Sequence, residues 1–300
     1  MNHRLLDFAE APAFLSVNNG LLVVRQDNEI RESVPLVDIA AVIASHRQVV
    51  FTQNALAALA QAGAIVVCCD ERHRPVSMLL PLEAHSTQAE RFRTQSVAPL
   101  PVKKRIWREI VKAKLEAQDL ALERLYGERA GLVELARTVR SGDPANVEAT
   151  AAVRYWPRLF ADAGFRRGGE EDGRNHLLNY GYGVLRAVTA RAICAAGLHP
   201  SLGVNHRNRY NAFALADDLM EPLRPLADFQ VASWCREEPR ERWRLEKTSK
   251  SMLLAAISSR YSTMGESRSL FDIAARRAQL LSAVLAGTEK EFVWEPVTLP

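Results

Sequence analysis

The sequence predicts an α+β protein in which a small N-terminal β-rich domain precedes a larger all-α C-terminal domain. Two observations support this fold class. The first 87 residues contain short apolar runs separated by turn residues, a pattern typical of β-strands. After Pro101 the apolar residues recur at helical spacing over long segments. We therefore expect two domains, residues 1–87 and residues 88–300, each long enough to bury a core.

The N-terminal domain contains a predicted β-hairpin. The turn Asn18-Asn19-Gly20 separates the apolar runs FLSV and LLVVRQ, and an Asn-Gly turn between such runs is a strong hairpin signal. The segment QNALAALAQ predicts one short helix, ended by Gly63. Further strands are predicted at residues 36–44, 64–69 and 75–80.

The C-terminal domain is predicted to consist of helices. Apolar stripes run along VKKRIWREIVKAKLEAQDLALERLY and then along GLVELARTV. Three more helices are expected: one after Pro144 that contains Glu148, one capped by Asn175 and stopped by Gly197, and one from Phe213 to Trp234. The final residues EFVWEPVTLP are apolar but short, and we expect them to dock as an extended segment.

Composition limits the class of protein. The chain is 48% hydrophobic and 25% charged, which is typical of a soluble globular protein. It shows no signal-peptide pattern and no run approaching about 18 apolar residues. We therefore expect a cytoplasmic protein without membrane contact. The cysteines lack the CxxC spacing of zinc or redox sites, and we expect buried thiols at Cys68, Cys69, Cys194 and Cys235.

The distribution of charge favours a nucleic-acid partner more than the net charge does. The formal net charge of +4 permits such a partner without requiring it. Residues 173–216, however, contain five arginines and neither Asp nor Glu, and a second basic segment spans residues 103–114. Either segment could follow a phosphate backbone, although solvated helix faces have the same composition.

Three acids and one histidine form a candidate metal site. Asp218 and Glu221 are three residues apart and would share a helix face. Glu148 interrupts an apolar helical stripe, and His206 lies just before the helix that carries the two acids. An oxygen-rich set with one imidazole suits Mg²⁺ or Mn²⁺ and therefore phosphate chemistry.

The pattern leaves alternatives open for each member of this set. Asp217 is spaced i,i+4 from Glu221 and competes with Asp218. His199 competes with His206, although its position before Pro200 favours a capping or packing role. The acids could also form ordinary ion pairs, Asp218 with Arg224 and Glu148 with Arg154.

Several segments together resemble the CRISPR-associated spacer-acquisition integrase ("Cas-one") family. They are NVEATAAVRYW, GLHPSLGVNHRNRYNAFALADDLMEPLRPLAD, KKRIWREIVKAKLEAQ and the NNGLLVV hairpin. The segment DDLMEPLRP is most similar to the sequences of the family branch that accompanies type II systems. The resemblance implies an N-terminal β-domain for dimer and partner contacts and a C-terminal helical catalytic domain.

The resemblance also implies a reaction and its residues. Glu148, His206 and Glu221 match the catalytic metal ligands of the family, and Asp218 matches a further acid. In some branches the last acid is Asp where this chain has Glu221. The implied reaction is transesterification: each 3′-hydroxyl of a captured foreign DNA duplex attacks a phosphodiester of the CRISPR repeat. Hydrolytic nicking is implied as a side activity.

The implied partners are double-stranded DNA, a second copy of the chain, a small companion adaptation protein ("Cas-two") and the type II effector nuclease. Tyr155 and Trp156 are expected to pack or stack near the site. Candidate DNA contacts are Arg207, Arg209, Lys247 and Lys250. Two other functions compete: a non-catalytic DNA-binding scaffold of the adaptation complex, and a free-standing metal nuclease for branched DNA.

Overall fold

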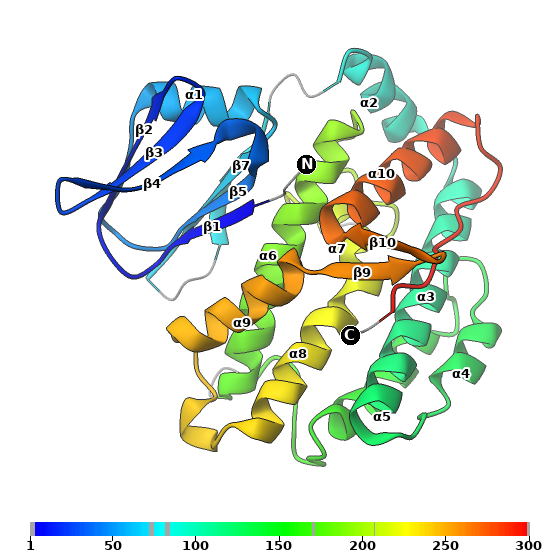
Figure 1. Ribbon diagram of the computed structural model, residues 1–300. Coiled ribbons are helices and arrows are strands. Elements are labelled where there is room, and N and C mark those ends of the chain that lie inside the picture. Colours follow the sequence, from blue (N-terminus) through cyan, green and yellow to red (C-terminus); the bar gives the residue numbers. More distant parts are fainter. Residues whose placement is uncertain (1–3, 72–74, 82–84, 170–171, 207, 299–300) are drawn as a thin grey trace. The chain divides into compact units, whose positions relative to one another are not determined.

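The computed structural model of the chain describes residues 4–71, 75–81, 85–169, 172–206 and 208–298. They fall into two compact units, Met1–Gln88 and Ala89–Pro300. The first unit is β-rich and the second is mostly helical, which confirms the predicted α+β class (Figure 1).

Among the described residues, the first unit contains two four-stranded sheets with the orders β4-β3-β2-β6 and β1-β5-β7-β8. In the second of these sheets β1, β5 and β7 are parallel and β8 is antiparallel. The strands are β1 (Arg4–Phe8), β2 (Ala13–Asn18), β3 (Leu21–Gln26), β4 (Glu29–Pro35), β5 (Ile39–Ala44), β6 (Val49–Phe51), β7 (Ile65–Cys69) and β8 (Pro75–Leu79). The three runs predicted as further strands thus correspond to β5, β7 and β8.

The predicted hairpin is confirmed, because β2 pairs antiparallel with β3 and Asn18 lies opposite Leu21. Asn19 and Gly20 have φ angles of 48° and 75°. Two successive positive φ angles define the type I′ turn, whose twist matches that of the flanking strands. The Asn-Gly sequence therefore sets the register of this sheet.

The predicted short helix is α1 (Gln53–Gln61), and its apolar side packs into the core of the first unit. The side chain of Thr52 caps it by accepting a hydrogen bond from the Ala55 amide. Leu59 of α1 lies in one buried cluster with Leu15 of β2 and Val66 of β7. One core therefore joins both sheets and the helix.

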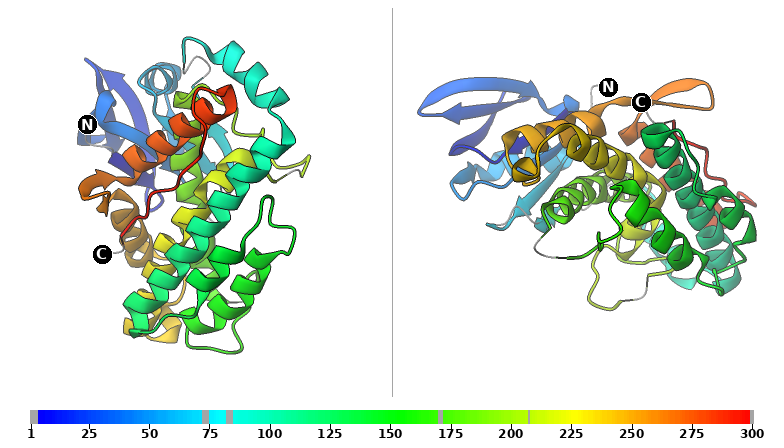
Figure 2. Two further views of the ribbon diagram at one scale, coloured as in Figure 1. Left: turned by 90° about the vertical axis from the view of Figure 1, so that its right-hand side faces the viewer. Right: turned by 90° about the horizontal axis from the view of Figure 1, so that it is seen from below.

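Helices of between 7 and 27 residues build most of the second unit. They are α2 (Gln88–Val97), α3 (Leu100–Tyr126), α4 (Leu132–Thr138), α5 (Val147–Leu159), α6 (Gly173–Ala195), α7 (Ala214–Met220), α8 (Arg224–Glu237), α9 (Lys247–Ser258) and α10 (Leu270–Ala286). Helix α3 packs against α4, α5 and α8, and α6 packs against α7, α8, α9 and α10 (Figures 1 and 2). Helices α3 and α6 therefore form the frame on which the other helices are arranged.

The prediction of an all-α second domain is wrong at one place. Strands β9 (Arg260–Thr263) and β10 (Glu266–Ser269) form an antiparallel hairpin. Met264 and Gly265 in its turn again have positive φ angles, of 52° and 77°. Each strand is only four residues long and mostly polar, so neither shows the apolar alternation that predicts a strand.

The single helix predicted from Phe213 to Trp234 is divided. Helix α7 ends at Met220, the 3-10 turn η2 (Glu221–Leu223) follows, and α8 begins at Arg224. Pro222 within η2 has no backbone N–H and cannot donate to the carbonyl four residues earlier, so the α-helix cannot continue regularly through it. The break gives Glu221 the first position of η2.

The start of α6 also differs from the prediction. The cap is Asp172, whose side chain accepts a hydrogen bond from the Arg174 amide. Asn175 lies inside the helix, where its side-chain Oδ1 accepts a hydrogen bond from the Gly168 amide. The predicted stop is confirmed, because the helix ends at Ala195 and Gly197 follows with a φ of 69°.

The C-terminal tail docks as predicted. Phe292 and Trp294 are buried, and Arg277 of α10 donates to the Val293 carbonyl and pairs with Glu295 at 2.6 Å. Figure 2 shows the tail, drawn in red, beside α10. The apolar tail residues therefore complete the core of the second unit.

Composition led to two expectations, one about the burial of the cysteines and one about membrane contact. Cys194 is buried as predicted, but Cys68, near the end of β7, is exposed. Cys69 and Cys235 are partly buried. In the described part of the chain, no helix is both long and apolar enough to cross a membrane.

Candidate metal centre

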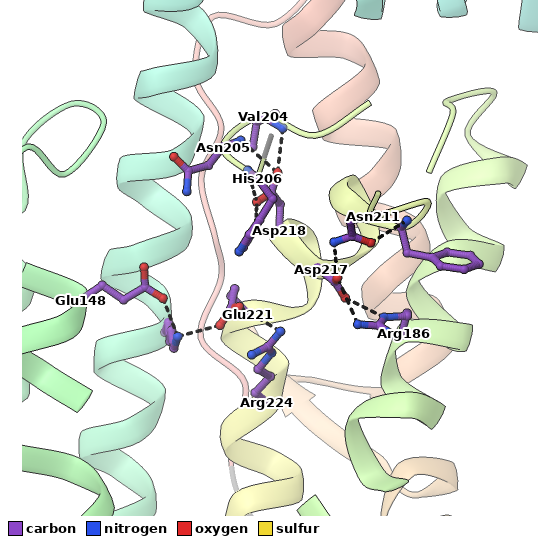
Figure 3. A network of polar contacts seen from close by, with 12 residues as sticks. Glu148, Arg186, Val204, Asn205, His206, Asn211, Asp217, Asp218, Glu221 and Arg224 are labelled. Atoms are coloured by element: carbon purple, nitrogen blue, oxygen red, sulfur yellow. Dashed lines mark hydrogen bonds and ion pairs between the residues drawn. The ribbon is translucent and has the colours of Figure 1, made fainter. Parts of the chain in front are cut away.

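The acids and the histidine singled out in the sequence come from separate elements of the second unit (Figure 3). Glu148 lies in the first turn of α5, and His206 lies in the loop that precedes α7. Asp218 belongs to α7, and Glu221 begins η2. A lysine of α3, Lys114, lies between the two glutamates.

The local fold around α5 positions Glu148. The carboxylate of Asp143 accepts hydrogen bonds from the amides of Val147 and Glu148, at 2.9 and 3.0 Å, and so caps the helix from the preceding turn. An acid in the first turn also interacts favourably with the helix dipole. The Glu148 side chain is 27% exposed and does not pair with Arg154 in the structure.

Glu221 is a buried carboxylate held by two cations. Its side chain is 3% exposed, its Oε1 lies 3.1 Å from Arg224 and its Oε2 lies 2.7 Å from Lys114. Burial raises the pKa of Glu221, but the charges of Lys114 and Arg224 outweigh burial and lower it. Glu221 is therefore a carboxylate anion in the interior of the protein.

Lys114 bridges the two glutamates. Its Nζ lies 2.6 Å from Oε1 of Glu148 and 2.7 Å from Oε2 of Glu221. Burial lowers the pKa of Lys114, but the fields of Glu221 and Glu148 outweigh burial and raise it. The described structure thus contains a positive charge between the two carboxylates.

The loop before α7 is wrapped around the carboxylate of Asp218, which is fully buried. Oδ2 accepts hydrogen bonds from the amides of Val204 at 2.7 Å and Asn205 at 3.0 Å, and Oδ1 accepts one from the amide of His206 at 3.2 Å. A Cβ at Gly203 would lie 2.9 Å from Oδ2, so only glycine lets the loop approach this closely.

Asp218 also orients the His206 ring. Nδ1 of His206 lies 2.5 Å from Oδ1 of Asp218, and this hydrogen bond raises the pKa of His206 despite partial burial. Nδ1 therefore carries the proton of the neutral ring, and Nε2 is the nitrogen available to a metal ion. The ring is 40% exposed and packs edge-on against Trp107, with centroids 5.8 Å apart.

These bonds change the role assigned to Asp218. The sequence suggested a supporting metal ligand, but both carboxylate oxygens are engaged by the loop and by His206. The geometry favours a positioning residue that fixes the histidine. Asp218 makes no pair with Arg224, which contacts Glu221 instead.

The structure separates the two alternatives that the sequence left open. Asp217 pairs with Arg186 at 2.7 Å and accepts a hydrogen bond from Asn211 at 2.8 Å, so it takes no part in orienting His206. His199 lies near the Ser201 hydroxyl and packs edge-on against Phe92. The capping and packing role that the sequence favoured for His199 agrees with these contacts.

Two carboxylates and an imidazole are ligand types that suit a hard divalent cation, although in the structure both carboxylates contact Lys114. Within the described ranges, no group of three or more His, Cys, Asp or Glu side chains is arranged to hold a metal ion. Oε2 of Glu221, however, is buried without a hydrogen bond, because its 2.7 Å contact with Lys114 lacks hydrogen-bond geometry. A buried carboxylate oxygen that lacks a hydrogen bond, with a second carboxylate on the same lysine and a histidine close enough to interact with its charge, fits Mg²⁺ or Mn²⁺.

The candidate DNA contacts differ in their surroundings. Arg209 and Lys247 are exposed, and the Arg209 guanidinium lies 4.7 Å from the Tyr210 ring centroid. Lys250 is buried, with its ammonium 5.8 Å from the Tyr180 ring, so its position does not support a DNA contact. Arg207 lies outside the described residues.

The two aromatic residues of α5 have packing roles. Tyr155 is fully buried and donates a hydrogen bond to Asp228 at 3.0 Å, and Trp156 packs against Phe165. Neither contact places these rings beside the acids of the site. The packing alternative therefore accounts for both.

Sequence reasoning missed Lys114, which was grouped with the surface cations of residues 103–114. One signal could have identified it: Lys114 lies four residues after Ile110 and three after Val111, so it falls on the buried stripe of α3. A lysine on such a stripe requires a buried anion as its partner.

Comparisons with known proteins agree with the fold. The profile of the family described as CRISPR associated protein Cas1 matches residues 8–260. The CRISPR-associated endonuclease Cas1 of Neisseria meningitidis serogroup C is 39% identical over 219 residues, which cover 72% of this chain and 71% of that protein.

Two solved structures share the fold at low sequence identity. A casposase bound to an integration product has a TM-score of 0.79 at 20% identity and covers 97% of this chain and 93% of its own. A chain of a Cas6-RT-Cas1–Cas2 complex has a TM-score of 0.75 at 18% identity, over 98% of this chain and 36% of its own. The profile spans most of the sequence and the Neisseria relative spans more than two thirds of it, so the chain belongs to the CRISPR-associated Cas1 family.

Proposed function

We propose that this protein is a divalent-metal-dependent DNA integrase and endonuclease of CRISPR adaptation. It would join the 3′-hydroxyl ends of captured foreign DNA to the CRISPR repeat by transesterification, with Mg²⁺ or Mn²⁺ as cofactor. The observation that carries the proposal is that one buried lysine bridges Glu148 and Glu221, while His206, oriented by Asp218, interacts electrostatically with Glu221. The names of the relatives, an endonuclease and a casposase bound to an integration product, support the same chemistry.

Each side chain has a distinct task in this proposal. Glu148 and Glu221 supply carboxylate oxygens, and His206 supplies Nε2. Arg224 holds Oε1 of Glu221 and leaves Oε2 directed toward Lys114 and Glu148. A bound divalent cation would polarise a phosphoryl oxygen and stabilise the charge that develops during attack.

The protein contributes no covalent nucleophile. The oxygen of the attacking 3′-hydroxyl belongs to the captured DNA and forms a bond to phosphorus while the bond to the leaving oxygen of the repeat strand breaks. Water in place of that hydroxyl would give hydrolytic nicking. The task of the chain is to hold the phosphodiester and the ligands in position.

We propose double-stranded DNA, a second copy of the chain and a Cas2 companion as partners, because one solved neighbour is a Cas1–Cas2 complex. In this proposal the second unit is catalytic and the first unit makes dimer and partner contacts. Arg209 and Lys247 are the candidate phosphate contacts, because both are exposed. The type II effector nuclease would be a further partner. The reaction would take place in the cytoplasm, where a bacterial CRISPR array lies.

The test is transfer of a labelled 3′-hydroxyl duplex into a plasmid that carries a CRISPR array, with the Cas2 companion and either Mg²⁺ or EDTA. We expect joined product from the wild type, and we expect EDTA and His206→Ala each to abolish it while DNA binding persists. His199→Ala is the matched control and should retain joining, because His199 contacts Phe92 and Ser201 rather than the site.

Other outcomes identify the competing functions. DNA binding without joining in wild type would indicate a scaffold. Metal-dependent cutting of branched DNA that requires neither the companion nor an array would indicate a free-standing nuclease. Joining that persists in EDTA and in His206→Ala would contradict the proposed metal centre.

A further inference from the structure

Lys114 is a largely buried lysine whose ammonium lies between two carboxylates. Its side chain is 14% exposed, and its ammonium contacts one carboxylate of α5 and one of η2, 2.6 Å from Glu148 and 2.7 Å from Glu221. Without this positive charge, the carboxylates would repel each other in a largely desolvated site. The lysine therefore stabilises the arrangement of acids that the described structure shows.

The two contacts of Lys114 are not equivalent. The ammonium donates a hydrogen bond to Oε1 of Glu148, whereas Oε2 of Glu221 has the short distance without hydrogen-bond geometry. The other oxygen of Glu221 is held by Arg224 at 3.1 Å. Glu221 would therefore keep its orientation through Arg224 if the ammonium moved away.

An ion coordinated by both glutamates would have to lie within about 2 to 2.5 Å of their oxygens. The Lys114 ammonium is already within hydrogen-bond distance of the same pair. Two cations packed this closely in a site of low dielectric would repel each other strongly. A lysine can withdraw, because its ammonium sits on a flexible four-carbon chain.

We propose that Lys114 is a resident counter-cation of the metal centre, which holds Glu148 and Glu221 together in the metal-free protein and is displaced when a divalent ion binds. The inference rests on the proposed metal centre and adds a residue that opposes metal binding. The ammonium of Lys114 stabilises the two carboxylates and, because it must be displaced, lowers the affinity for the metal ion. The structure thus assigns the lysine a positioning role.

The test is Mn²⁺ binding at pH 8, followed by calorimetry and by the loss of the free-ion electron paramagnetic resonance signal. We expect Lys114→Met to bind Mn²⁺ roughly 10-fold more tightly than wild type, because no ammonium has to be displaced. Lys114→Arg retains the charge and should bind no more tightly than wild type. Lys112→Met is the matched control on the same helix, and it should not change the affinity, because Lys112 pairs with Glu109 instead.

Thermal unfolding gives a second readout that does not depend on activity. In EDTA, Lys114→Met should unfold at a lower temperature than wild type, and saturating Mn²⁺ should raise its Tm by more than it raises that of wild type. Lys114→Gln, which retains a hydrogen-bond donor, provides a folded alternative if the methionine variant does not fold without metal.

The outcomes separate the inference from the proposed function. Mn²⁺ binding that Glu148→Gln weakens, with no gain in Lys114→Met or Lys114→Gln, would overturn the role of Lys114 and leave the metal centre standing. A gain in Lys114→Arg equal to that in Lys114→Met would also overturn it, because the charge would not be the cause. Absence of Mn²⁺ binding in wild type and in both neutral variants would overturn the metal centre and the inference together.

Discussion

At the scale of single residues, the hydrogen bond between Asp218 and Nδ1 of His206 determines that Nε2 is the ring nitrogen available to a ligand. Three successive backbone amides donate to its carboxylate, and the His206 ring lies 2.5 Å from it. A carboxylate that orients a ligating histidine is usually nearly as important for metal affinity as the ligands. We therefore propose that Asp218 supports metal binding through His206 without contacting the ion.

We predict that Asp218→Asn weakens Mn²⁺ binding roughly 10- to 100-fold. The amide nitrogen would be a donor where the loop amides and Nδ1–H of His206 are also donors, so the ring would lose its orientation. Calorimetric titration measures the effect.

The matched control for this prediction is Asp217→Asn. Asp217 pairs with Arg186 on α6, so its substitution should reduce stability but leave the affinity for Mn²⁺ unchanged. Wild-type affinity in Asp218→Asn would show that the ring does not need the carboxylate.

At the scale of elements, a close backbone contact fixes the start of α6. The start of α6 fits tightly against the 3-10 turn η3 (Arg240–Arg242) and the residue after it, because a Cβ at Gly173 would lie 1.5 Å from the Trp243 carbonyl oxygen. No side chain can be accommodated there without a backbone shift. Glycine at this position follows from a tertiary contact rather than from a turn.

We predict that Gly173→Ala lowers the free energy of unfolding by about 3 kcal/mol or more, because the backbone of Trp243 or of α6 must move. Chemical denaturation measures the change. Gly169→Ala is the control, since its Cβ would meet no atom closer than 3.6 Å. Equal stability of the two variants would show that the contact is not a tight one.

At the scale of the whole molecule, Asp228 connects three helices of the second unit. Its carboxylate is fully buried on α8 and accepts hydrogen bonds from Tyr155 of α5 at 3.0 Å and from Tyr182 of α6 at 2.5 Å. Burial raises the pKa of Asp228 from 3.8 to about 6, although the two tyrosine hydroxyls act to lower it. This network joins the helix of Glu148 to the helices that support Glu221.

This pKa predicts a pH dependence of global stability. Between pH 3.8 and about 6 the folded chain binds a proton at Asp228 that the unfolded chain has lost. The resulting stabilisation is present below pH 3.8 and is lost as the pH rises through about 6. From pH 7 to pH 4, wild type should therefore gain about 2 kcal/mol relative to Asp228→Asn, which does not titrate.

Urea unfolding of both proteins across this pH range measures the difference, and the comparison cancels other groups that titrate in the same range. A difference in stability that is constant with pH would show that Asp228 has an ordinary pKa.

Local sequence determined much of the fold. The Asn19-Gly20 turn gave the β2–β3 hairpin, and the apolar stripe after Pro101 gave α3. The β9–β10 hairpin was not predicted, because its strands are short and polar and depend on α10 and the tail for packing. Alternation of apolar and polar residues predicts a strand only where the strand's own sequence shows that alternation.

The sequence by itself determined the α+β class and the family resemblance, and it proposed Glu148, His206, Asp218 and Glu221 as members of one site. Only the tertiary structure decided that Asp218 orients the histidine, that Asp217 pairs elsewhere, and that Lys114 lies between the two glutamates. The physical reason is that residue type and spacing specify which groups an element can present. Which of those groups meet depends on how α3, α5 and α7 pack, and these helices are far apart in the chain.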